Sequence, residues 1–410
     1  GTGGTAHARA PRLATGQLAP GAAGHSAEGQ LMDRSNRVLW MIIGVVLLIP
    51  ALIVDSTRFL ANWLTMFAFL VSIGVGALLL VALEYVVGAK WSIPFRRIIE
   101  FISGLVPLSL LLVIPVLFGA RQLYEWTHAE IVAADHILHM KAPYLNVPFW
   151  VMRTILYFVV WIAAYFFYVN GSRRQDSTGD IRFTKHARVA SPIFIILYGI
   201  TMTFASIDWI MSLAPHWFST MFGVYFAVAG MVGALAATTF AATQLKLNGM
   251  LPNSVGRDHF YNLGGLLFAM NTFWAYIAFA QFLLIWYGNI PIERYWFAPR
   301  TEGGWMWFTL IQVVGHFVVP FFALISREAK MNLLRLRWVS VWILAAHMID
   351  MYWITVPSIR PNGPALSWHE LWFAPLAVGI CLFVWLWSAK RSPILPIRDP
   401  RLEIGLSFHL

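Results

Sequence analysis

The chain has 410 residues, of which 59% are hydrophobic and only 12% are charged, whereas a soluble domain carries about 25% charged residues. Long stretches contain no Asp, Glu, Lys or Arg and approach or exceed the roughly 20 residues that cross a bilayer; they are residues 59–83, 101–120, 154–172, 260–292 and 371–389. Composition therefore excludes a soluble globular domain and predicts an all-α polytopic membrane protein.

The formal net charge of +10 does not indicate nucleic-acid binding, because the charges separate apolar stretches instead of clustering on one face. Cys381 is the single cysteine, so the sequence offers no CxxCH haem motif, no iron–sulfur ligand set and no internal disulfide. Any redox metal held by this chain alone would have to be a b-type haem.

Residues 1–36 are rich in Gly, Ala and polar side chains, lack the apolar core of a signal peptide, and are predicted to be a disordered tail. Met32 directly precedes the first apolar span, which suggests it as a translation start, so that residues 1–31 would not be native. Residues 37–390 form the predicted transmembrane domain, and residues 391–410 a C-terminal tail.

We predict ten spans, at residues 37–55, 61–87, 99–119, 148–170, 189–213, 217–243, 259–288, 305–326, 337–356 and 369–389. Only Ala214-Pro215-His216 separates the fifth span from the sixth, and the proline favours a tight turn over one continuous helix.

Lysine and arginine counts predict the orientation. The N-terminal tail, the loops after the second, fourth, sixth and eighth spans, and the C-terminal tail together hold 22 of the 29 Lys and Arg residues. The positive-inside rule then places both termini in the cytoplasm, and the setting would be a bacterial inner membrane.

A short internal sequence similarity suggests that the chain contains a duplicated segment. Ser206-Ile207-Asp208-Trp209 in the fifth span resembles Met348-Ile349-Asp350-Met351 in the ninth, four spans later and therefore in a helix of equal orientation. We predict two parallel-repeat four-helix bundles, spans 2–5 and 6–9, flanked by spans 1 and 10.

Ionisable residues inside spans cost ~3 kcal/mol on insertion scales and usually face a bundle interior or water. The proton-path candidates on this basis are Asp208, His316, His347, Asp350 and Glu84. His347 and Asp350 share a helix face, and His316 lies in the middle of the preceding span. A line of such groups can pass protons across part of the bilayer, but each residue could instead be satisfied by a neighbouring helix. Asp55 and Glu100, at span ends, are predicted to be interfacial.

Asp208 and His216 flank the turn at Pro215 and are candidates for quinone binding. A carboxylate and an imidazole at one interface could hydrogen-bond the two quinone oxygens and accept the two protons of a quinol. The alternative is that Asp208 holds the turn and His216 is exposed.

Two histidine pairs allow metal-site hypotheses. His316 and His347, on adjacent spans, could together ligate one b-haem, although a two-haem protein would need four such residues. His136 and His139 have helical metal-ligand spacing but no third ligand, so no metal is predicted there. Their segment is instead expected to be an amphipathic outer surface, suited to docking an extrinsic subunit.

The stretch SIDWIMSLAPHWFSTMFGVYF (residues 206–226), the ten spans and the four-plus-four repeat resemble the NrfD/PsrC-like membrane subunits. Within that family the chain looks most like the F-type subunits (ActF) of bacterial alternative complex III, a quinol:cytochrome c oxidoreductase. The resemblance covers residues 37–390.

This resemblance implies a cofactor-free subunit that holds no metal and is not catalytic in isolation. The implied partners are a sister ten-span subunit, multihaem and monohaem cytochromes c, and a large iron–sulfur subunit, which would carry the haem c and the iron–sulfur clusters. Asp208 and His216 fall in the family's quinone region, and the other proton-path candidates fall along its proposed proton route.

The expected function is therefore membrane anchoring and proton conduction in a respiratory quinol:cytochrome c oxidoreductase. The sequence leaves undecided whether the chain also forms a quinone pocket. A proton-coupled secondary transporter is one alternative, but Pro107, Pro115 and Pro320 interrupt spans that do not correspond between the two bundles. A b-haem quinol anchor is the other alternative.

Overall fold

The computed structural model describes residues 55–364 and 367–410, and the described residues form helices without any strand. The principal helices are α2 (Ser56–Val87), α3 (Ile93–Ser103), α4 (Leu105–Leu112), α5 (Ile114–Phe118), α9 (Val147–Thr178), α10 (Arg182–Trp209), α11 (Met221–Leu247), α12 (Arg257–Gly288), α15 (Trp305–Ile311), the π-helix η3 (Gln312–Val318), α16 (Val319–Leu324), α18 (Leu333–Ile359) and α20 (Phe373–Ala389). The short elements are α6 (Ala120–Leu123), η1 (Glu125–Thr127), α7 (Ala129–Ala134), α8 (His136–Lys141), η2 (Met211–Leu213), α13 (Pro291–Arg294), α14 (Ala298–Thr301), α17 (Arg327–Met331), α19 (Trp368–Leu371) and α21 (Leu402–Leu406).

The predicted class of all-α polytopic membrane protein is confirmed. Within the described ranges, eight helical segments are long and apolar enough to cross a bilayer, and α20 adds a shorter apolar helix of 17 residues. These nine segments overlap the second to tenth predicted spans. The first predicted span, the 1–36 tail and Met32 lie outside the described residues.

Proline and glycine set the interruptions. The turn predicted around Pro215 is present, since α10 ends at Trp209 and α11 begins only at Met221. Pro107 and Pro115 stand near the starts of α4 and α5, where a helix leaves its first backbone N–H groups unpaired in any case. The third predicted span is therefore three short helices in succession.

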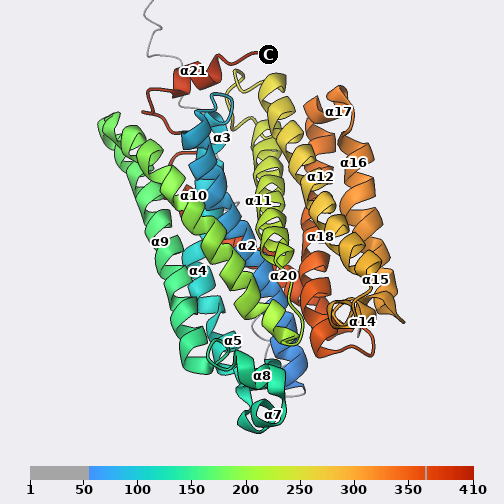
Figure 1. The fold of residues 1–410 in the computed structure, drawn as a ribbon. Coiled ribbons are helices and arrows are strands. Elements are labelled where there is room, and N and C mark those ends of the chain that lie inside the picture. The colour runs from blue at the N-terminus through green and yellow to red at the C-terminus, as the bar shows by residue number, and fades with distance from the viewer. Residues whose placement is uncertain (1–54, 365–366) are drawn as a thin grey trace, which may run out of the picture.

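The helices form two groups that meet along α2 and α11 (Figure 1). The first bundle consists of α2, the α3–α5 run, α9 and α10. The second consists of α11, α12, the α15–α16 run and α18. Helix α2 packs on α11 and also on α18, so the first helix of each group is the shared centre of the fold.

Two glycines bring these central helices together. A Cβ atom on Gly76 would lie 2.4 Å from the carbonyl oxygen of Gly230, and one on Gly230 would lie 2.6 Å from the carbonyl oxygen of Ser72. Any side chain would therefore force the backbones apart. Small residues that permit close backbone approach are the usual means of helix association in membranes.

Short sequence matches between the two central helices support the predicted repeat. Thr-Met-Phe occurs at 65–67 in α2 and at 220–222 at the start of α11, an offset of 155 residues (220 − 65). Val-Gly-Ala-Leu occurs at 75–78 and again at 232–235, an offset of 157 (232 − 75). Both pairs lie on the first helix of a bundle, as a duplication would require.

The C-terminal segment folds back over the end of the structure where α21 lies (Figure 1). The Nε2 atom of His259, in α12, is 2.8 Å from the carbonyl oxygen of Gly405. A Cβ on Gly405 would lie 3.0 Å from the carbonyl oxygen of Lys90, at the start of the first bundle's α3 region. The segment thus bridges the two bundles. We call this end, which carries Lys90 and α21, the basic end, and the end with α7, α8 and α14 the opposite end.

We expect Gly230→Ala to lower the free energy of unfolding by about 1–3 kcal/mol, since a methyl group at the α2–α11 contact overpacks it. The matched control is Gly265→Ala, also in a helix but with no atom within 4 Å of the added carbon. Thermal unfolding of the detergent-solubilised chain would measure both. Equal midpoints for the two variants would contradict this account of the contact.

Candidate functional site

The two aspartates of the predicted repeat, Asp208 on α10 and Asp350 on α18, are both fully buried. Each lies on the last helix of its bundle and accepts a hydrogen bond from the helix that comes before that one in the chain. The donor helix is α9 for Asp208 and the α15–η3 segment for Asp350. They therefore occupy related places, and their surroundings can be compared directly.

Asp208 is held by a bidentate ion pair. Arg153 donates from Nε to Oδ2 and from Nη2 to Oδ1, both at 2.8 Å, and the Tyr157 hydroxyl donates to Oδ2 at 2.6 Å. The guanidinium also donates to the Tyr144 carbonyl at 3.0 Å and lies 3.8 Å from that ring. Fork-to-fork geometry is the strongest form of such a pair, so both oxygens of Asp208 are held in place.

Asp208 also organises the turn that follows it. Its backbone carbonyl accepts from the Trp150 indole at 2.9 Å and from the Ser212 hydroxyl at 2.6 Å. Of the two interpretations made from sequence, this geometry agrees with Asp208 holding the turn.

His216 lies apart from that cluster. Its Nε2 is 2.6 Å from Oδ2 of Asp135, and both side chains are about one-third exposed. Hydrogen bonds from His216 and from the α8 backbone lower the pKa of Asp135. No hydrogen bond or ion pair in the described part of the chain joins His216 to Asp208, so the two quinone-binding candidates are not brought together.

Asp350 has a different environment. Its Oδ1 accepts from the Tyr225 hydroxyl and from Nε2 of Gln312 at 2.9 Å. Within the described residues no Lys or Arg forms an ion pair with it, and Oδ2 has no hydrogen-bond partner. The fully buried Arg300 on the same bundle instead donates to backbone carbonyls and to Ser358.

The structural repeat explains this difference. Trp150 and Thr154 of α9 correspond to Trp305 and Thr309 of α15, since 305 − 150 and 309 − 154 are both 155. In each bundle the threonine hydroxyl accepts from an indole of the last helix, Trp209 at 3.1 Å in the first and Trp353 at 2.9 Å in the second. The same offset as in the Thr-Met-Phe pair thus relates the two accepting threonines, whereas the donors stand one residue after Asp208 and three after Asp350.

By this correspondence the position of Arg153 is occupied in the second bundle by Phe308, and that of Tyr157 by Gln312. The second bundle thus has a phenylalanine at the sequence position of the cation that fixes the first aspartate. The repeat has diverged into one aspartate locked in an ion pair and one held only by neutral donors.

The two candidate histidines do meet in the second bundle. The His316 and His347 ring centroids are 6.5 Å apart, and the His347 Nε2 is 3.0 Å from the Ser72 hydroxyl on α2. His316 stacks on Trp274 with centroids 3.8 Å apart. Both histidines are fully buried.

A π-helical segment places His316. Pro320 has no N–H to donate to the carbonyl four residues earlier, which belongs to His316, and the Asn271 amide donates to that carbonyl instead at 2.9 Å. The residues around this point form η3, and such π-turns occur frequently at functional sites.

Several polar atoms in this region have no hydrogen-bond partner although they are buried. They are Nδ1 and Nε2 of His316, Nδ1 of His347, Oδ2 of Asp350, Oε1 of Gln312, Nε1 of Trp274 and Oδ1 of Asn271. A buried polar atom left unpaired costs about 1–3 kcal/mol, so a group of them is suited to binding internal water. A cavity of about 30 Å³ adjoins Tyr225 and is lined also by Gln281, Trp296 and Trp353, which is room for a water molecule.

Glu84 belongs to a separate network at the basic end. It accepts from Arg96 at 3.1 Å, and Arg96 also pairs with Asp399 of the C-terminal segment at 2.5 Å. The other members of the network are Arg97, Glu100, Asp176 and Arg401. Glu100 is only 2% exposed, so it is enclosed within this network.

This network was missed in the sequence because its members are far apart in the chain. Four carboxylates and three guanidinium groups meet there, so the network has one more acid than it has cations. The sequence signal was the Arg96-Arg97-x-x-Glu100 run on one helix, which resembles an ordinary topology anchor.

The histidines of the predicted outer segment, His136 and His139, lie exposed on α8. The described residues contain no group of three or more His, Cys, Asp or Glu side chains that could hold a metal ion. No protein-family model matches this chain, and no curated protein matches it. Function is therefore inferred from the geometry above.

We expect Asp208→Asn to destabilise the protein by about 3–5 kcal/mol, because it leaves the Arg153 cation buried without its partner. Asp350→Asn makes the same chemical change where no cation is paired, and should cost much less. Thermal unfolding in detergent compares the two. A smaller loss for the Asp208 variant would refute the distinction between a locked and an unlocked aspartate.

The C-terminal segment should detach at acid pH. Burial acts to raise the pKa of Asp399, but the charges of Arg96 and Arg401 outweigh it and hold the pKa below its usual range. A depressed pKa contributes stability above the unfolded value of about 3.9, and that contribution is lost as the pH falls through the lower folded value.

Hydrogen exchange of α21, corrected for the intrinsic rate, would show this as lost protection below about pH 4. Asp399→Asn should lose that protection already at neutral pH. Glu403→Gln, an exposed change in the same segment, is the control and should behave as the wild type.

Proposed function

We propose that this chain is a cofactor-free membrane subunit of an NrfD/PsrC-like quinol-oxidising respiratory complex, and that its second bundle conducts protons. The sequence resemblance supports the respiratory part of the proposal, and the observation that carries proton conduction is Asp350: a fully buried carboxyl group with two neutral donors and no paired cation within the described residues. Intramembrane carboxyl groups of this kind are typical of proton relays.

The chemistry follows from what surrounds Asp350. A carboxyl group without a fixed counter-ion can change its protonation state, whereas a bidentate Arg–Asp pair resists the change. Tyr225 donates its hydroxyl to Asp350 and is also one of the residues that line the small cavity, so the carboxyl group lies one residue away from a place with room for water. A proton can then pass by exchange along these hydrogen bonds.

The histidines extend the line toward the centre of the fold. His316 and His347 continue from the Asp350 region to Ser72, where the α2–α11 contact closes the interior. Ser72 and Glu84 are twelve residues apart on α2, about 18 Å along a helix. We therefore propose a half-channel that ends at Ser72, with the Glu84 network serving the basic end separately.

The Lys and Arg asymmetry supports a cytoplasmic basic end in a bacterial inner membrane, with the half-channel opening to the outer side. Partners carrying haem c and iron–sulfur clusters would accept the electrons there. Because Arg153 and Tyr157 occupy both oxygens of Asp208, we assign quinol oxidation to the sister subunit rather than to an Asp208–His216 pocket.

The b-haem alternative is disfavoured by packing. The His347 Nε2 already bonds Ser72, and His316 is stacked on Trp274, so a flat porphyrin cannot enter between the rings without displacing these contacts. The transporter alternative keeps one supporting observation, the interruption of the Trp305–Leu324 run by η3, since broken helices are common in secondary transporters.

We expect the chain, tagged at its C-terminus and extracted in mild detergent, to copurify with four kinds of partner: a second ten-span chain, multihaem and monohaem cytochromes c, and a large iron–sulfur subunit. Mass spectrometry and haem spectra identify them. Recovery of the chain alone or as a homo-oligomer would overturn the respiratory proposal and favour the transporter.

In the purified complex, Asp350→Asn should slow proton release coupled to quinol turnover on the order of 100-fold, as expected when a positioned proton-transfer group is lost. The control is Asp55→Asn, an exposed carboxylate whose described role is to cap α2. A stopped-flow pH indicator measures the rate. An unchanged rate and stoichiometry would remove Asp350 from the path.

A further inference from the structure

A groove of about 410 Å³ lies toward the basic end, where α9, α10 and the end of α2 meet. Its walls are largely aromatic and are formed by Tyr85, Phe166, Phe167, Tyr168 and Phe183. Polar groups also line it, namely Asn170, Ser172, Arg174 and His186. The proton path described above uses none of these residues.

The groove carries unneutralised positive charge. Residues 173–188 contain five Lys and Arg residues and two Asp residues. Both aspartates are engaged, Asp176 with Arg97 and Asp180 with Arg182. In the described part of the chain, no carboxylate pairs with Arg174 of the groove or with its neighbours Lys185 and Arg188.

A second, independent feature is the Ser172 hydroxyl. The side chain is only 4% exposed, lines the groove, and its Oγ has no hydrogen-bond partner. A buried donor left unpaired is unfavourable unless something else bonds it. The groove therefore has an unpaired buried donor on one of its lining residues, and its lining includes Arg174 and His186 but no carboxylate.

The groove also spans the boundary between apolar and charged sequence. Residues 154–172 contain no Asp, Glu, Lys or Arg, and Arg173-Arg174 follow immediately. Phe166 and Phe167 are about half exposed on the apolar side of that boundary. A ligand lying here would place a charged head by Arg174 and a hydrocarbon part along the phenylalanines.

We propose that this groove binds an anionic phospholipid, with its phosphate at Arg174 and His186 and an acyl chain along Phe166 and Phe167. Basic pockets between membrane helices recognise the phosphates of such lipids. This inference does not depend on the identity of the electron-transfer partners.

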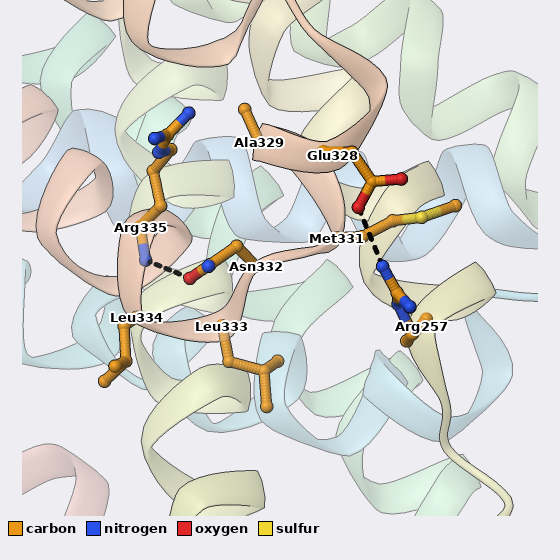
Figure 2. Close-up of a pocket in the computed structure, with 8 residues that line it drawn as sticks. All are labelled: Arg257, Glu328, Ala329, Met331, Asn332, Leu333, Leu334 and Arg335. Atoms are coloured by element: carbon orange, nitrogen blue, oxygen red, sulfur yellow. Dashed lines mark hydrogen bonds and ion pairs between the residues drawn. The ribbon is translucent and has the colours of Figure 1, made fainter.

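A second groove, of about 430 Å³, serves as a comparison (Figure 2). There Arg257 is paired with Glu328 at 2.9 Å, and Figure 2 shows the Arg335 side chain directed away from that pair. The lining of this second groove thus includes an acid, Glu328, whereas that of the α9–α10 groove includes none. Charge complementarity therefore favours the latter as the lipid site.

The test is native mass spectrometry of the full chain in detergent, titrated with phosphatidylglycerol, phosphatidylcholine or inorganic phosphate. We expect phosphatidylglycerol to be retained selectively. The double variant Arg174→Gln, His186→Gln should weaken its retention roughly 10-fold, as loss of two phosphate contacts implies. Because both residues are exposed, the variant is expected to fold, and its thermal midpoint checks this.

Arg182→Gln is the matched control, because it removes a charge from the same connection but lies outside the groove with a side chain 78% exposed. It should retain phosphatidylglycerol as the wild type does. Equal retention of phosphatidylcholine, or equal losses in both variants, would overturn the proposal. The proposal would also be overturned if inorganic phosphate alone were retained, or if a short-chain quinone displaced the lipid. Either result would identify a different ligand for the groove.

Discussion

The close contact between α2 and α11 is the constraint on which the remaining structure depends. It exists because Gly76 and Gly230 have no side chains, and each backbone lies where the other's Cβ would be. Gly233, one helical turn on, leaves space in the same way for the His347 ring, since a Cβ there would be 2.9 Å from its Cδ2. The contact therefore joins the bundles and also admits a histidine of the second bundle to the surface of α2, where Ser72 bonds it.

Around this centre the two bundles share a helix arrangement, but the residues that surround their aspartates differ. The tryptophan–threonine hydrogen bond from the last helix is kept in both. The position of Arg153 in the first copy is occupied by Phe308 in the second, and that of Tyr157 by Gln312. As a result Asp208 is held in a bidentate ion pair, whereas Asp350 is held by neutral donors, and the proton role proposed for Asp350 rests on this difference.

Buried charge at the two ends of the molecule serves to hold segments together. At the basic end Arg96 contacts acids from α2, from its own helix and from the C-terminal segment, so it ties three parts of the chain to one point. At the opposite end Arg153 joins α9 to α10 through Asp208. Burying such pairs costs desolvation, and the cost is offset only where the geometry satisfies both partners.

Sequence alone determined the class of the protein, the position of most spans and the identity of Asp350, His347 and His316 as unusual residues. These follow from local quantities, namely hydropathy over about 20 residues and the cost of charge in hydrocarbon. The turn at Pro215 was also predictable, because proline acts on its own neighbours.

Only the tertiary structure decided which polar groups meet. Asp208 and His216 are eight residues apart yet bond different partners, Arg153 and Asp135, each more than fifty residues away. Glu100 stands at a span end, and only folding shows that it is buried among Arg96 and Arg97. The reason is physical: whether a carboxyl group is locked or free depends on which charges other helices bring within hydrogen-bonding distance, and helix packing sets that distance.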